Sequence, residues 1–303
     1  MIRSPRMLLV PAAVVAITVA ACSGGASPEP TSVATPQPTP ELTVLVTPAP
    51  TPMPTEEDPG HGDLRIVEAA VATIDVDGDP TDWAAIEGLD LTLEAITGED
   101  VDSRDARVKV AYDEQYLYVL FEVDDDYDWV DGDPHLSGAS AVMWQIDPGA
   151  GEHMGADEPD RETSLGMVDL WHWELDCVAG DETGGAVSGP GEGNDPGNDA
   201  ACNLDDEWAT VPDRREDDNG TGAENSILGV WSHTNPTAGA AGTWIFELRR
   251  PLQTGDEQDG QFAAGEELHL ALAYWDPDQA SDGWADDGHV QSANQGWIEV
   301  HLD

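Results

Sequence analysis

Lysine is almost absent from this chain of 303 residues. Lys109 is the single lysine, and lysine and arginine together number 11 against 62 acidic residues, which gives a formal net charge of −51. Nucleic acid and anionic lipid bind to clustered Lys and Arg, so the composition argues against both as partners. An acidic surface repels itself at low salt, whereas 1 M salt shortens the Debye length to about 3 Å. We interpret the charge as adaptation to a salt-rich, halophilic setting, which says little about function.

Cysteine is scarce as well, with three in the chain. Cys177 and Cys202 bracket a segment rich in Gly and Asp that cannot bury a core, and disulfides persist in exported proteins. The sequence therefore predicts a disulfide that closes this segment at its base, with metal ligation as the alternative. No CxxC or CxxCH motif occurs, so any haem would have to be held non-covalently.

The one long apolar run lies at the N-terminus. It extends from Met7 to Ala21, follows two arginines and ends in small residues before Cys22. At about 15 residues it is too short to span a membrane comfortably. We expect residues 1–22 to be a lipoprotein signal peptide with Cys22 lipidated in a lipobox, so that the protein is extracytoplasmic and anchored to a membrane through lipid. An ordinary signal peptide or a short membrane helix is the alternative.

Two further segments follow the predicted signal peptide. Residues 23–62 are rich in Pro, Thr, Ser and Ala, a composition typical of extended, solvated chain, and we expect a disordered stalk there. Residues 63–303 are then the globular part, long enough for one large β domain.

Alternation of apolar and polar residues is common in the globular part, and helical periodicity is scarce. The strand-like runs are 66–74, 107–112, 116–123, 141–146, 167–173, 227–231, 243–252, 267–275 and 296–302. Many short strands separated by Gly, Pro, Asp and Asn turns, without helices between them, predict an all-β fold, an immunoglobulin-like antiparallel β-sandwich with long loops.

An acidic run, Asp75 to Asp79, invites comparison with a calcium loop. An EF-hand needs Gly at its sixth position and Glu at its twelfth, whereas here Gly78 is fourth and Ile86 is twelfth. An acidic turn is the favoured interpretation, with calcium binding as the alternative.

The segment 141–174 carries the most suggestive chemistry. Two strand-like runs enclose a loop that holds His153 and Met154, both of which can ligate soft metals. A period of two places Trp171 and Trp173 on one face of the second strand and His172 on the other, so they cannot all line one pocket. The chain shows no Ser/His/Asp spacing, zinc motif or phosphate loop, and we expect no catalytic activity.

The ordered set of segments resembles a known family. DGDPTDWA, RVKVAYDEQYLYVLFEVDD, SAVMWQID, VDLWHW, WIFELRRPLQTGD and ALAYWDPD, followed by GHVQSANQGWIEVHL, are similar to the haem-binding domain of ethylbenzene-dehydrogenase-type gamma subunits and related membrane-anchored cytochromes. The similarity covers residues 71–302, nearly the whole globular part. It implies a subunit that binds haem b and relays electrons to an oxidoreductase or cytochrome partner.

The resemblance also implies particular site residues. Met154 and His289 would be the two axial ligands of the iron, with His153 or Met167 as substitutes for Met154, and Met/His ligation favours electron transfer. Trp144, Trp171, Trp173 and Trp275 are core residues by default, and any of them could also wall the haem. Arg249 and Arg250 could pair with the propionates, or equally with surface carboxylates.

A binding protein of another class is the rival hypothesis. Some of the same segments, the opening Asp-Gly-Asp and the Tyr-Leu-Tyr hairpin, are shared with family 9 carbohydrate-binding modules, and 11 tryptophans could form a platform for stacking sugars. This hypothesis predicts a surface lipoprotein without haem, with aromatic side chains exposed on one face.

Overall fold

The computed structural model describes residues 65–96, 101–130, 136–156, 163–175, 184–188, 203–210, 215–217, 226–279 and 289–303. All of them belong to one compact unit, Asp58–Asp303. The signal peptide with Cys22, the stalk and the Cys177–Cys202 disulfide lie outside the described residues and stay predictions. In the described part of the chain, no helix is both long enough and apolar enough to cross a membrane.

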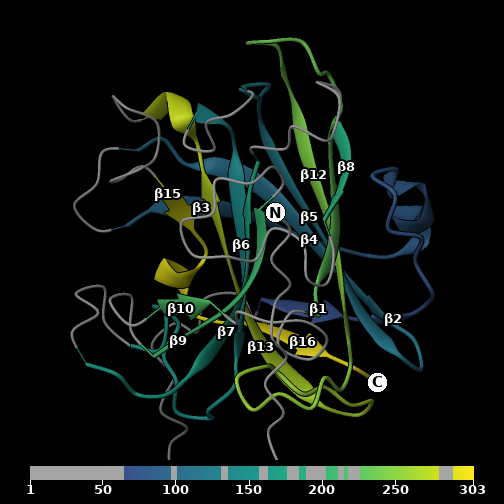
Figure 1. The fold of residues 1–303 in the computed structure, drawn as a ribbon, viewed down its shortest axis with the longest axis vertical. Coiled ribbons are helices and arrows are strands. Elements are labelled where there is room, and N and C mark those ends of the chain that lie inside the picture. The colour runs from purple at the N-terminus through teal and green to yellow at the C-terminus, as the bar shows by residue number, and fades with distance from the viewer. Residues whose placement is uncertain are drawn as a thin grey trace, which may run out of the picture. The chain divides into compact units, whose positions relative to one another are not determined.

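Two β-sheets form the domain (Figure 1). The first contains β10 (Arg215–Asp217), β9 (Asn203–Ala209), β7 (Val168–Glu174), β6 (Ala139–Gln145), β13 (Glu267–Trp275), β15 (His289–Gln291), β16 (Ile298–His301) and β1 (Ile66–Glu68). The second contains β3 (Leu89–Ala95), β4 (Arg104–Tyr112), β5 (Tyr116–Asp126), β12 (Ala241–Pro251), β11 (Leu228–His233) and β8 (Gly184–Ser188), with β2 (Ala70–Val71) beside β4. Pairing of β15 with β3 joins the sheets, and all pairs except β1–β16 and β2–β4 are antiparallel. The prediction of an all-β antiparallel sandwich is confirmed.

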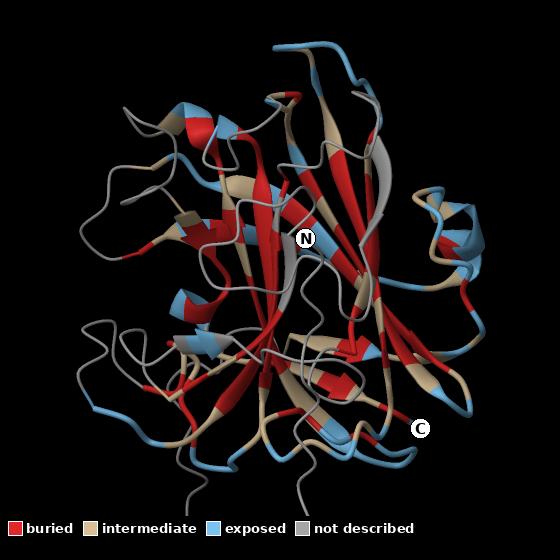
Figure 2. Cartoon of the chain, viewed as in Figure 1, coloured by how far each residue is buried: buried red, intermediate tan, exposed pale blue. Residues whose placement is uncertain are grey.

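Large aromatic side chains fill the space between the sheets. The first sheet contributes Trp144, Trp171 and Trp173, and the second contributes Trp244 and Phe246, all with no exposed surface. The buried residues run along the middle of the strands of both sheets (Figure 2). Burial of such side chains removes the most apolar area from water per residue, so this layer contributes most to stability.

The outer face of the second sheet is also buried in part. Strand β5 sends Val119 and Phe121 into the central core, and Tyr118 and Leu120 to the opposite face. There they contact residues 70–76 and the 3-10 helix η1 (Pro80–Ala85), which contributes Trp83. Burial on both faces explains why β5 is an almost continuous apolar run rather than an alternating one.

The acidic run Asp75–Asp79 forms a turn held by Glu247 of β12. One carboxylate oxygen of Glu247 accepts hydrogen bonds from the backbone amides of Gly78 (2.6 Å) and Asp77 (3.1 Å), and the other accepts from the indole of Trp83 (2.8 Å). Gly78 has φ of 82°, a conformation that glycine adopts without strain. The run therefore forms a turn that anchors η1 (Pro80–Ala85) to the sheet.

The outer face of the first sheet is covered in part by the connection between β6 and β7. Met143, Leu170 and Ala271 on this face pack with Ala150 and Met154 of the connection. Two further 3-10 helices, η4 (Pro277–Gln279) and η5 (Ala293–Gln295), flank β15. A cavity lies on the outer face of the first sheet, between the β6–β7 connection and β15.

Candidate functional site

Three cavities in the described part of the chain have linings that differ in kind. A cavity of about 510 Å³ on the outer face of the second sheet is lined mainly by acidic and polar residues, and Arg107, its one cation among the described lining residues, pairs with Asp90. A cavity of about 410 Å³ beside Asp259 is lined mainly by one acidic loop. The third, of about 450 Å³ on the outer face of the first sheet, combines apolar, aromatic and polar side chains. Small-molecule sites typically have that mixture and a volume of roughly 300–1,000 Å³.

Small residues in register form the floor of this third cavity. Ala141 of β6 lies between His172 of β7 and Ala273 of β13, and Ala273 in turn pairs with Gln291 of β15. The next row along the strands is Leu170, Met143 and Ala271. Two alanines between a histidine and a glutamine leave a trough across the sheet, because their methyl groups reach least far from the backbone.

Aromatic rings form one end of the trough. Trp275 of β13 pairs with His289 of β15, and their rings stack with centroids 4.9 Å apart and an interplanar angle of 26°. The ring of His172 lies 5.1 Å from Trp275 at an angle of 52°. Trp275 and His289 are half-buried, whereas His172 is buried. This end of the cavity therefore presents a flat ring with limited freedom to move.

A tight loop forms the opposing wall. Reciprocal backbone hydrogen bonds join Gly151 to Gly155 and His153 to Ala156, so the loop closes on itself. Gly155 has φ of 95°, and a Cβ there would lie 2.4 Å from the carbonyl oxygen of Gly166, so only glycine fits. The ring of buried His153 lies 3.3 Å from the side-chain nitrogen of Gln291, which ties the loop to β15.

Met154 occupies the tip of this loop in an unusual conformation. Its φ is 53°, the only positive φ of a non-glycine residue in the described part of the chain. The left-handed region costs a non-glycine residue roughly 1 kcal/mol, and such strain clusters at binding sites. The half-buried side chain of Met154 lines the cavity.

Two carboxylates also line the cavity. Glu207 of β9 is buried, and its Oε1 lies 3.5 Å from Nδ1 of His172. Glu152, on the loop, is half-buried and close enough to Arg65 to oppose the lowering of the Arg65 pKa that burial causes. Arg65 itself donates to the backbone carbonyls of Ser292 and Gly296 and does not line the cavity.

The structure divides the residues that the sequence predicted for one site. Met154 and His289 line the same cavity. Trp144, Trp171 and Trp173 lie on the other face of the first sheet, fully buried in the central core, so they form no wall of this cavity. Of the substitute ligands, His153 does not line the cavity, and its ring contacts Gln291. Half-buried Met167 does not line the cavity either, and its backbone amide donates to Asp147.

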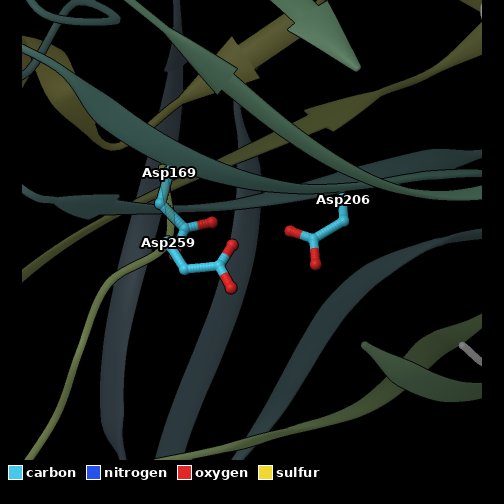
Figure 3. Close-up of side chains that lie close together, drawn as sticks. All are labelled: Asp169, Asp206 and Asp259. Carbon is cyan, nitrogen blue, oxygen red and sulfur yellow. The ribbon is translucent and has the colours of Figure 1, made fainter. Parts of the chain in front are cut away.

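Arg250 belongs to a separate ionic cluster inside the domain. Its guanidinium has no exposed surface and donates to both carboxylate oxygens of Asp169, with one nitrogen also 3.2 Å from Asp206 and 3.3 Å from Asp259. The three carboxylates lie close together (Figure 3), with an oxygen of each within 4.8 Å of the others. Arg250 is thereby committed to protein carboxylates, so it is not placed to pair with a haem propionate.

Burial sets the ionisation of this cluster. Burial acts to lower the pKa of Arg250, but the three carboxylates outweigh it and raise that pKa. Burial raises the pKa of Asp206 well above its usual range and that of Asp259 to about 6, although Arg250 opposes both shifts. One cation thus stabilises a group of acids that the interior would otherwise force to take up protons.

Several cavity residues were missed by sequence reasoning. Trp275 was expected to be core, and Gln291 and Glu207 were not singled out. The alternation within β13 could have separated Trp275 from Tyr274, which is fully buried on the core side. Nothing in the local sequence around Glu207 indicates that β9 adds a strand to this sheet.

Comparison with known proteins gives distant structural matches only. No protein-family model matches the sequence, and no curated protein matches it. A family 9 carbohydrate-binding module from Caldicellulosiruptor kristjanssonii, solved with glucose, matches at 12% identity with a TM-score of 0.41, over 78% of this chain and 95% of that one. The same kind of module solved with cellotriose matches at 12% identity and 0.40, over 78% and 93%. A candidate carbohydrate-binding protein from Bacteroides uniformis matches at 9% identity and 0.42, over 75% and 87%. These values are too low to assign a ligand to this chain.

The predicted resemblance to haem-binding domains is wrong. The matching structures are carbohydrate-binding proteins and not haem-binding domains, which removes the support for haem b, iron and electron transfer. The residues agree with the correction, because the expected tryptophan walls and the expected propionate partner all face away from the cavity that holds Met154 and His289. The assignment of Met154 and His289 as axial ligands followed from that resemblance.

Proposed function

We propose that the domain binds carbohydrate without catalysing a reaction, and that the saccharide lies in the trough on the outer face of the first sheet. The observation that carries the proposal is the combination of a stacked aromatic wall, Trp275 on His289, with an alanine floor and polar side chains around it. The tryptophan platform expected from the sequence is not the one observed, since Trp144, Trp171 and Trp173 are core residues.

The chemistry of a sugar ring matches this arrangement. A pyranose has C–H groups on its faces and hydroxyls around its edge, so one face packs on an aromatic ring while the edge needs hydrogen-bonding partners. Trp275 offers the ring, and Gln291 and Glu152 lie along the cavity where hydroxyls would point. Because the stacked rings and the closed loop are already ordered, little conformational entropy is lost on binding.

Isothermal titration of the full-length protein against soluble glucose, cellulose, xylan, mannan and chitin oligosaccharides tests the proposal. We expect at least one series to bind, and Trp275→Ala to weaken that binding about tenfold or more through loss of the stacking surface. Trp297→Ala is the matched control, because half-buried Trp297 packs at the edge of the same sheet face but does not line the cavity. Failure of every series to bind, or equal loss with both variants, would contradict the proposal.

The absence of catalysis and the cellular setting can be tested with the same protein. Bound oligosaccharides should be recovered intact after long incubation, whereas shortened products would show a hydrolase.

Labelling with radioactive fatty acid in a bacterial host should require Cys22, since the lipid anchor is proposed only on the sequence that precedes Cys22. Together these properties describe a module that holds saccharide near a membrane surface.

A further inference from the structure

The charge of the trough points to the kind of saccharide it takes. Its lining includes the carboxylates of Glu152 and Glu207, and no lysine or arginine is among the described lining residues. The chain as a whole carries a formal charge of −51. A concave site with walls of low dielectric focuses such a field, which attracts cations and repels anions.

The two carboxylates differ in what they can offer a ligand. Glu207 is 3% exposed and has the ring of His172 beside it, which gives it a local partner. Glu152 is half-buried at the rim, on the loop that also carries Met154. Arg65, whose pKa the charge of Glu152 raises, donates to two backbone carbonyls and does not line the cavity. Glu152 is therefore the carboxylate that an entering ligand meets.

The aromatic wall favours the same sign of charge. The face of a tryptophan ring carries partial negative charge and attracts an ammonium group within about 6 Å of its centre. Trp275, on which His289 stacks, lines the trough together with Glu152, so an ammonium in the trough would lie near the indole and a carboxylate. An anionic sugar would meet repulsion from both.

We propose that the trough prefers saccharides that carry a free ammonium, the glucosamine type of unit, over neutral sugars of the same linkage and over uronates, with Glu152 as the residue that determines this preference. The inference rests on the proposed carbohydrate function and adds the chemical class of the ligand to it.

Titration of the full-length protein with three matched oligosaccharides tests this preference, namely oligomers of glucosamine, of N-acetylglucosamine and of glucuronate, at a pH where the amine is protonated. We expect the glucosamine oligomer to bind about tenfold more tightly than the acetylated one, and the uronate not to bind measurably. The preference should shrink in 1 M salt, where the Debye length is about 3 Å. Equal affinities for the three, or a preference for uronate, would overturn the inference.

Two variants separate a local effect from that of overall charge. Glu152→Gln should bring the glucosamine and N-acetylglucosamine affinities to within about threefold of each other, because the amide can still hydrogen-bond to hydroxyls but carries no charge. Glu114→Gln, which removes the same charge at an exposed turn between β4 and β5, should leave the preference unchanged. If both variants reduce the preference equally, the overall charge and not Glu152 determines it, and the inference fails.

The same data show which of the two proposals fails. Binding of neutral oligomers that needs Trp275 but has no ammonium preference would leave the carbohydrate function standing and remove the inference. Binding of tetramethylammonium as tight as that of glucosamine, with no binding of neutral sugars, would mean an ammonium site without sugar recognition, and both proposals would fall.

Discussion

The rings of Trp275 and His289 stack across two neighbouring strands, with their centroids 4.9 Å apart. The two residues are direct register partners on β13 and β15, so the sheet itself brings them together. Stacking restrains the indole to one orientation before any ligand arrives. Interactions that are ordered in advance contribute more to affinity, because less entropy is lost when the ligand binds.

The role of this stacking can be measured with two substitutions of His289. His289→Ala removes the ring that stacks on the indole of Trp275, and we expect carbohydrate affinity to fall about three- to tenfold. His289→Phe keeps a flat ring against the indole and should retain most of the affinity. Titration calorimetry of both variants checks this, and equal losses would mean that His289 acts through its imidazole nitrogens instead of through stacking.

Filling the trough should abolish binding without unfolding the domain. Ala273 lies on the floor and is half-buried, so Ala273→Leu directs a larger side chain into the cavity and not into the core. We expect binding to become undetectable while the melting temperature changes by no more than a few degrees, since surface substitutions typically alter stability by about 0.5 kcal/mol or less. Unchanged affinity in a folded variant would place the ligand elsewhere. Ala264→Leu, at an exposed position, is the control for added volume.

Stability should depend strongly on the single guanidinium of Arg250. Arg250→Met leaves Asp169, Asp206 and Asp259 buried without their cation, and breaking such a buried pair typically costs about 3–5 kcal/mol. Arg249→Met is the matched control. Arg249 lies on the opposite face of β12, where it packs 4.7 Å above the ring of Tyr116, an interaction of about 0.5–1 kcal/mol.

Urea unfolding monitored by tryptophan fluorescence distinguishes the two arginine variants. A loss of free energy of unfolding at Arg250 no larger than that at Arg249 would mean that the buried acids are satisfied by protons alone. Asp206→Asn combined with Arg250→Met should recover part of the loss, because one fewer buried acid then lacks a partner.

Much of the sandwich could be predicted from the sequence, because its strands alternate or are bounded by turn residues. The run 267–275 is β13 without change, and the runs 107–112 and 116–123 lie within β4 and β5. Strand β9 (Asn203–Ala209) was missed because three acids in a row, Asp205 to Glu207, interrupt its apolar residues. Its pairing with β7 explains them, since Asp206 enters the ionic cluster and Glu207 faces the cavity.

The site was harder to predict, for a physical reason visible in β7. Alternation placed Trp171 and Trp173 opposite His172, and the structure agrees. Which face of β7 lies in the core depends on how the second sheet packs against it, and the sequence of β7 alone does not indicate this. The haem resemblance assigned the tryptophans to the same site as Met154 and His289, whereas the sheet separates them. The trough itself depends on Ala141 and Ala273, which are unremarkable in sequence and become neighbours only through register.

The carboxyl group of Asp128 should make stability depend on pH. Burial, followed by the charges of Asp125 and Asp276, raises its pKa in the folded protein to about 9, whereas an unfolded aspartate titrates near 3.9. Between these two values the folded state binds more protons than the unfolded state, so stability falls as pH rises from about 4 to about 9. Asp128→Asn removes this dependence, and we expect it to be more stable than the parent by a margin that grows over that range and levels off above it. Urea midpoints at pH 5, 7 and 9 measure the margin. Asp102→Asn, at an exposed position, corrects for the general benefit of removing one negative charge, and a margin no greater than that of the control at any pH would show that Asp128 ionises normally.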